Sequence, residues 1–230
     1  MDWFAAVDIY CERTGPAFWA EPFNAFSNAA FVLAAAWAAV TARGRATPAM
    51  VWLLIAMAAL IGPGSFLFHT FANGWSELAD TLPIWSFVAL FVFVAIHRFA
   101  GVKPGKLVAI ALGLAALLTL VFLAGGEGTA SDGALPAPSL LNGSEQYAPA
   151  LLALIVFAVI TWRRGHPMQP WILAALLTFI AALFARTIDL RVCSTQPVGT
   201  HFLWHLLNGL MIGILLQGLV RTTVPLRATP

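Results

Sequence analysis

The chain has 230 residues, of which 60% are hydrophobic and only 10% are charged, and its mean hydropathy is +0.86. Soluble globular domains are about 45–50% apolar and about 25% charged. The composition therefore excludes an ordinary soluble enzyme, a disordered protein and a nucleic-acid-binding protein. The net charge of +2 indicates no partner by itself. We expect one polytopic membrane domain covering residues 1–230.

Seven apolar runs are long enough to cross a membrane, because a spanning helix needs about 20 mostly apolar residues. None alternates as a strand does, and helices satisfy their own backbone hydrogen bonds in lipid. The expected spans are 23–41, 49–68, 78–96, 107–124, 147–162, 171–188 and 200–220. Gly62-Pro63-Gly64 is expected to break the second of them. The sequence thus predicts an all-α bundle of seven transmembrane helices, with an outer segment 1–22 and a tail 222–230.

The distribution of charge predicts how this bundle is oriented. Nine of the twelve basic residues fall in alternate connections or in the tail: Arg43, Arg45, Arg98, Lys103, Lys106, Arg163, Arg164, Arg221 and Arg227. All ten acidic residues fall on the other side or at helix ends that face it. Short basic loops stay in the cytoplasm. We therefore expect the N-terminus outside and the C-terminus in the cytoplasm.

The two cysteines, Cys11 and Cys193, both fall on the predicted outer side. An oxidising compartment there would permit a disulfide bond. A bond between them would tie the N-terminal segment to the entrance of the last helix, and the alternative is two unrelated thiols.

Three histidines are the main candidates for a functional site, because ionisable residues are costly within a membrane and mark functional positions. His201 and His205 are four residues apart and share one helix face. His69 lies at the same expected depth on the second span. Three imidazoles with an open fourth position are the ligand set of a catalytic zinc ion. The sequence therefore predicts a zinc site near the outer ends of the second and last spans.

Ser65 and Asp80 are expected beside this site. Ser65 precedes His69 by about one helical turn, and Asp80 lies near the outer start of the third span. Each residue also has a structural interpretation, such as an interfacial histidine or a helix-start carboxylate favoured by the helix dipole. Their convergence at one depth favours a metal centre.

Other polar residues near the outer side are expected to be structural. Arg186 and Asp189 are three apart on one helix, and an ion pair between them is expected. Asn24, Ser27 and Asn28 share a face at the start of the first span and are expected to bond between helices.

The N-terminal segment is acidic, with Asp8, Glu12 and Glu21 close to Tyr10 and Thr14. Calcium takes six to eight oxygen ligands from carboxylates, carbonyls and water. No EF-hand spacing is present. The residues alone therefore favour a solvated acidic segment over a calcium site.

These residues together resemble the alkaline ceramidase family, seven-helix zinc amidohydrolases of membranes that are related to the adiponectin and progestin receptors. The resemblance covers nearly the whole chain. It rests on Asp8-x-Tyr10-Cys11-Glu12, Glu21-Pro-Phe-Asn24-x-Phe-Ser27-Asn28, Ser65-x-x-x-His69 followed by Asp80, Asp189-x-x-x-Cys193 and His201-x-x-x-His205.

The resemblance implies two metal sites and a disulfide. It implies a Zn²⁺ ion held by His69, His201 and His205, with Asp80 and Ser65 beside the metal-bound water. For such a centre we expect Asp80 to act as general base and then general acid, and Ser65 to bond to the oxyanion. It also implies the Cys11–Cys193 disulfide. A Ca²⁺ site is implied at Asp8, the Tyr10 carbonyl, Glu12, Thr14 and Glu21, although one extra residue separates Asp8 from the cysteine and Thr14 replaces an amide-bearing residue.

The implied activity is hydrolysis of the amide bond of ceramide or a ceramide-like N-acyl lipid drawn from the bilayer, which yields a fatty acid and a lipid amine. The short loops suit a bacterial member, and we expect the inner membrane with the site facing the periplasm. The alternatives are a receptor like the adiponectin receptors and a transporter. Such receptors place the N-terminus inside, and a transporter needs polar residues along a path through the membrane.

Overall fold

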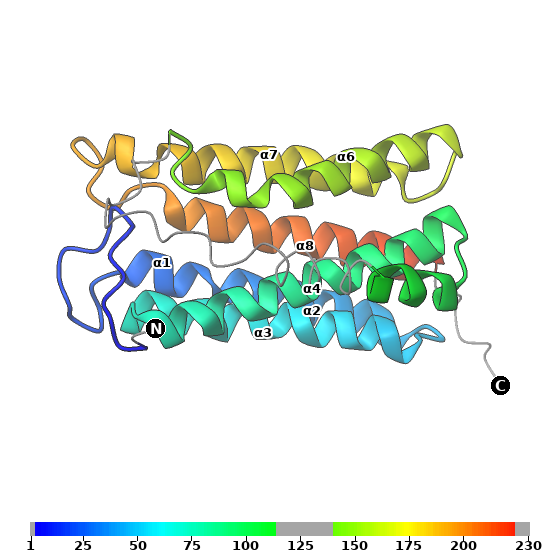
Figure 1. Cartoon of the computed structure of the whole chain (residues 1–230), viewed down its shortest axis with the longest axis horizontal. Coiled ribbons are helices and arrows are strands. Elements are labelled where there is room, and N and C mark those ends of the chain that lie inside the picture. Colours follow the sequence, from blue (N-terminus) through cyan, green and yellow to red (C-terminus); the bar gives the residue numbers. More distant parts are fainter. Residues whose placement is uncertain (1–2, 114–139, 224–230) are drawn as a thin grey trace.

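The computed structural model describes residues 3–113 and 140–223, which form long helices lying alongside one another (Figure 1). The helices are α1 (Pro22–Ser27), α2 (Ala29–Arg43), α3 (Ala49–Phe71), α4 (Gly74–Ala100), an unlabelled helix Pro104–Gly113, the 3₁₀ helix η1 (Ser144–Tyr147), α6 (Ala148–Arg163), α7 (Gln169–Val192) and α8 (His201–Thr223). The described ranges contain no strand, only an isolated bridge between Ala6 and Asn73. The all-α prediction is confirmed.

In the part of the chain that the structure describes, six segments are long and apolar enough to cross a membrane. The first combines α1 and α2 (Pro22–Arg43), the others are α3, α4, the η1–α6 pair (Ser144–Arg163), α7 and α8. The fourth predicted span, 107–124, is described only as far as Gly113, and its remainder lies outside the described residues. A seventh crossing therefore stays a prediction.

The positions of the helix ends show at which end of the bundle α4 ends and α6 begins. Backbone carbonyls near the ends of α8 and α4 accept three arginine hydrogen bonds: Arg45 Nη1 bonds to Arg221 O, Arg98 Nη1 to Thr223 O and Arg164 Nη1 to Phe99 O. The C-terminal ends of α2, α4, α6 and α8 thus gather at one basic end of the bundle, whereas α6 begins at the other end (Figure 1). The end of α4 and the beginning of α6 therefore lie at opposite ends of the bundle (Figure 1).

The predicted break at Gly62-Pro63-Gly64 is wrong, because α3 continues through Pro63 to Phe71. Neighbouring helices in a bundle compensate for the backbone bond that a proline removes. The two glycines serve close packing instead. A Cβ atom at Gly64 would collide with the carbonyl oxygen of Ala79 on α4, and one at Gly62 would meet the carbonyl of Asn28.

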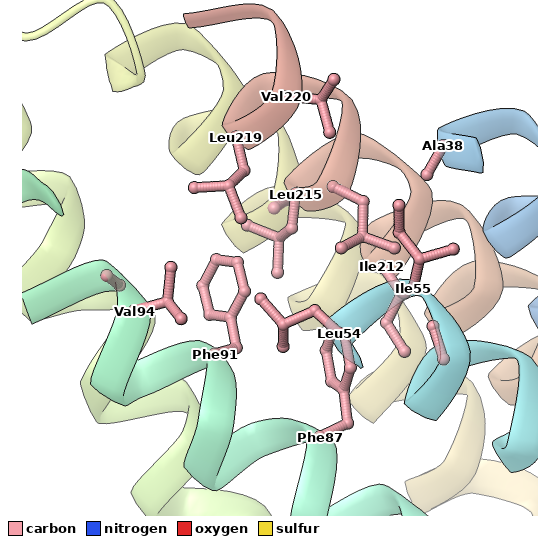
Figure 2. Packing of buried hydrophobic residues seen from close by; sticks show 14 of the residues in the cluster. Ala38, Leu54, Ile55, Phe87, Phe91, Val94, Ile212, Leu215, Leu219 and Val220 are labelled. Carbon is pink, nitrogen blue, oxygen red and sulfur yellow. The ribbon is translucent and has the colours of Figure 1, made fainter. Parts of the chain in front are cut away.

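The core of the bundle surrounds α8, whose most apolar stretch is 67% buried, compared with 22% in α4. Figure 2 shows side chains of α8 packed against those of α3 and α4. The labelled members include Leu54, Ile55, Phe87, Phe91, Val94, Ile212, Leu215, Leu219 and Val220. Large apolar side chains such as Leu33, Leu60 and Phe184 face outward, as expected of surfaces that contact lipid. The helix that carries two of the candidate histidines is therefore the most enclosed.

Candidate metal centre

Three buried imidazoles meet at the end of the bundle opposite the basic one. His69 lies in the last turn of α3, and His201 and His205 lie in the first two turns of α8. Their rings are at most 2% exposed, and one ring nitrogen of each lies within 4.8 Å of one from the other two. Nε2 of His69 and Nε2 of His205 are 3.1 Å apart. The structure thus brings together the three predicted zinc ligands.

The outer nitrogens of two of these rings have oxygen partners. Nδ1 of His69 lies 2.6 Å from Oε2 of Glu21, and Nδ1 of His205 lies 2.8 Å from Oγ of Ser27. The Ser27 hydroxyl donates its own proton to the carbonyl of Asn24, so it accepts from His205. Both histidines therefore carry a proton on Nδ1 and a lone pair on Nε2.

These tautomers make the centre suitable for a cation. Two Nε2 lone pairs that face each other at 3.1 Å repel unless a positive charge lies between them. Nδ1 of His201 is buried and has no hydrogen-bond partner among the described residues. Ligating histidines characteristically donate their second N–H to a carboxylate or another oxygen, which fixes their orientation. The donor set thus fits a zinc ion.

Glu21 connects the centre to the N-terminal segment. Its carboxylate pairs with the Arg13 guanidinium and accepts a bond from Nδ2 of Asn24 at 3.0 Å. Burial by itself raises the pKa of the Glu21 carboxyl, but the contacts with His69, Asn24 and the Arg13 guanidinium outweigh it and hold the pKa below its ordinary value. The carboxylate is therefore ionised and accepts the His69 proton.

Arg13 is buried and joins three oxygens around the centre. Besides Glu21, it donates to the carbonyl of Gly15 at 3.1 Å and to the carbonyl of His69 at 3.0 Å. The N-terminal segment is thereby fixed against the end of α3.

Ser65 and Asp80 lie beside the histidines, as predicted. Ser65 is buried on α3, within hydrogen-bonding reach of the Asp80 carboxyl on α4, which also interacts electrostatically with His69. The other oxygen of Asp80, Oδ1, is buried without a hydrogen-bond partner. The close approach at Gly64 brings these two helices together at this level.

Cys11 and Cys193 form a disulfide, so the predicted bond is present in the structure. The nearby carboxylate of Asp189 accepts three backbone N–H groups, from Cys11 at 3.0 Å, Thr200 at 2.7 Å and His201 at 2.9 Å. The predicted ion pair of Asp189 with Arg186 is wrong. Three aligned amide donors satisfy the carboxylate, and the Arg186 guanidinium lies instead among aromatic rings.

The residues suggested for calcium have other roles in the described contacts. Glu12 caps α1, accepting from the N–H of Phe23 at 2.7 Å and of Asn24 at 2.8 Å, and Glu21 binds Arg13 and His69. The Tyr10 ring stacks on His201, with centroids 3.7 Å apart. These contacts give no support to calcium ligation by Asp8, the Tyr10 carbonyl, Glu12, Thr14 and Glu21, and the calcium site stays a prediction.

Two contacts to the histidines were missed from the sequence. Glu21 was assigned to calcium, and Ser27 to a generic interhelical bond. Ser27 does bond between helices, whereas the Nδ2 groups of Asn24 and Asn28 bond within their own segment. The shared face of Ser27 with the other two polar residues was the only available signal.

Comparison with known proteins agrees with this geometry. The family model of ceramidases matches residues 10–227, which include every histidine of the centre and both cysteines. A search of curated proteins finds no match to the chain. Because the family match spans nearly the whole sequence, the chain belongs to the ceramidase family.

Proposed function

We propose that the protein is a zinc-dependent membrane hydrolase that cleaves the amide bond of ceramide or a ceramide-like N-acyl lipid. The observation that carries this proposal is the set of three buried imidazoles, two of them oriented by Glu21 and Ser27 so that their lone pairs converge. Membership of the ceramidase family supports lipid amide hydrolysis as the reaction class.

His69, His201 and His205 would hold the zinc ion, which supplies a Lewis acid that polarises the amide carbonyl and lowers the pKa of a bound water. Asp80 has a buried oxygen free to accept the proton of the attacking water. Asp80 then delivers that proton to the amide nitrogen as the carbon–nitrogen bond breaks. Ser65 donates a hydrogen bond to the carbonyl oxygen as negative charge develops on it.

An apolar cavity inside the bundle suits the acyl chain. Residues of α4, η1, α6 and α8 are among those that line it, including Trp85, Phe91, Tyr147, Trp204, Asn208 and Leu215. Trp204 lines the cavity and directly precedes His205 on α8, so one side chain of the cavity wall is next to a histidine of the centre in the chain. A long hydrocarbon chain lying there would present its amide group to the centre.

The test is metal content combined with hydrolysis. The purified protein should contain about one zinc ion per chain by mass spectrometry and should hydrolyse a fluorescent N-acyl sphingoid base, with the activity lost on chelation. Changing both His201 and His205 to Ala should abolish both properties. His97→Ala is the matched control, because His97 lies near the opposite end of α4 and bonds to the Val102 carbonyl. Zinc and hydrolysis retained in the double variant would refute the proposal.

The proposed setting is a bacterial inner membrane, with the centre facing the periplasm and the lipid substrate supplied by the bilayer. The disulfide lies at the same end as the histidines, and oxidising compartments favour such bonds. The basic residues at the other end suit the cytoplasmic side.

A further inference from the structure

Arg186 is a buried cation that the proposed reaction leaves without a role. Its side chain on α7 is only 5% exposed. The one hydrogen bond recorded for its guanidinium joins Nη1 to the hydroxyl of Tyr10 at 3.2 Å, and Nε is buried with no partner. Within residues 3–113 and 140–223, no carboxylate lies within 4.0 Å of it, and Asp80 interacts with it electrostatically from a greater distance. Arginine is rarely buried without an anionic partner, because an uncompensated charge in the interior is costly.

Aromatic rings enclose this guanidinium next to the metal centre. Its central carbon lies 5.7 Å from the ring centroid of Tyr10, 5.5 Å from that of Tyr147 and 5.7 Å from that of Trp204. Tyr10 also stacks on His201, so one ring separates Arg186 from a predicted zinc ligand. Tyr147 and Trp204 line the apolar cavity. Arg186 therefore lies where the cavity meets the histidines.

The cover over Arg186 comes from the outer end of the bundle. Tyr10 belongs to the N-terminal segment, and Asn142 donates to the carbonyl of Arg186 at 3.0 Å. A Cβ atom at Gly143 would lie 3.2 Å from Nη2, so the lack of a side chain there leaves room for the guanidinium. The acyl chain would extend into the cavity, and the part of the substrate near Arg186 is then the polar amine part.

We propose that Arg186 binds an anionic group on the amine part of the substrate, and that the protein prefers N-acyl amino acid lipids to neutral N-acyl amines. This inference rests on the proposed amide hydrolysis and, among the N-acyl lipids proposed there, favours those with an anionic amine part over ceramide, whose amine part is neutral. A carboxylate on the carbon next to the amide nitrogen would supply an anion in direct contact with the guanidinium, which no carboxylate of the described residues makes, and guanidinium groups bind carboxylates through two parallel hydrogen bonds. A neutral sphingoid base leaves the buried cation unpaired.

The test compares N-palmitoylglycine with N-palmitoylethanolamine, which differ mainly in a carboxylate against a hydroxymethyl group. The full-length protein should show a kcat/KM at least about tenfold higher for the glycine conjugate, the range expected for a charged hydrogen bond. In Arg186→Gln this ratio should fall to about one, mainly through KM, and Arg186→Lys should retain part of the preference. Arg191→Gln, an exposed arginine five residues further on the same helix, should leave the ratio unchanged.

Binding to zinc-depleted protein separates this inference from the proposed reaction. Tryptophan fluorescence should report tighter binding of N-palmitoylglycine than of N-palmitoylethanolamine, with the difference lost in Arg186→Gln, even if neither amide is hydrolysed. Equal ratios in the wild type and Arg186→Gln would overturn the inference. It would also be overturned if palmitate alone showed the dependence on Arg186, because the site would then hold the carboxylate of the product. Thermal midpoints identify any variant that fails to fold.

Discussion

Nδ1 of His69 lies 2.6 Å from Oε2 of Glu21, although the two residues are 48 positions apart. The carboxylate orients the imidazole and fixes its proton, so Glu21→Gln should weaken zinc binding by about 10–100-fold, the usual effect of losing such a partner. Competition with a chelator measures the affinity. Glu77→Gln is the matched control, since Glu77 is an exposed carboxylate near the start of α4 at the same end of the bundle. Equal zinc affinity in both variants would contradict a role for Glu21 in orienting His69.

Removal of the disulfide should destabilise the protein. Cys11 and Cys193 are separated by 182 positions, and cross-links that close long loops restrict the unfolded chain most. The double variant Cys11→Ser/Cys193→Ser should lose about 2–4 kcal/mol of stability. Thermal unfolding in detergent, with and without a reductant, measures this loss. A reductant should lower the thermal midpoint of the wild type and leave that of the double variant unchanged. A wild-type midpoint that does not change with the reductant would argue that the bond is absent in the protein as isolated.

Gly64 should tolerate no side chain. A Cβ atom there would meet the backbone carbonyl of Ala79, which cannot turn aside as a flexible side chain could. Gly64→Ala should therefore force α3 and α4 apart and destabilise the protein by about 1–3 kcal/mol. It should also reduce hydrolysis, because Ser65 and Asp80 lie on these two helices. Gly44→Ala, at a position with nothing within 4 Å, should change neither property.

The proposed orientation can be tested with two introduced thiols. The two native cysteines are joined to each other, so an added cysteine is the only free one. Gly15→Cys lies in the N-terminal segment and Gly44→Cys lies between α2 and α3, and neither position crowds a side chain. A maleimide that cannot cross membranes should label Gly15→Cys in intact cells, and Gly44→Cys only after permeabilisation. The reverse labelling pattern would show that the protein has the opposite orientation in the membrane.

Calcium should not stabilise the wild type through Glu12 and Glu21. The first carboxylate caps α1 and the second pairs with the Arg13 guanidinium, so a calcium ion would have to compete with these contacts. The thermal midpoint should be the same in excess calcium and in excess chelator selective for calcium. A midpoint that rises with calcium in the wild type but not in Glu12→Gln would instead establish the calcium site implied by the family resemblance.

Local patterns in the sequence predicted the parts of the site that depend on one helix or one depth. The spacing of His201 and His205 places them on one face of α8, and the run of apolar residues before His69 places it at the same level. Span boundaries follow in the same way from the length of apolar runs, because the bilayer imposes a minimum length on each helix.

Contacts between distant segments were beyond such patterns. Arg186 and Asp189 have the spacing of an ion pair, but spacing says nothing of the amide groups of Cys11, Thr200 and His201 that the fold brings to Asp189. Pro63 similarly has the local character of a helix breaker, whereas its effect depends on neighbouring helices that the sequence does not locate.

The carboxylate of Asp189 has a consequence for how a lipid arrives. It binds the amides of Cys11, Thr200 and His201 and so fixes the N-terminal segment to the first turn of α8. The Cys11–Cys193 disulfide reinforces this connection. The N-terminal segment therefore cannot move away from the centre without disturbing His201, one of the three candidate metal ligands. We therefore expect a lipid substrate to enter laterally between helices. It would come directly from the hydrocarbon core of the bilayer rather than from the surrounding water.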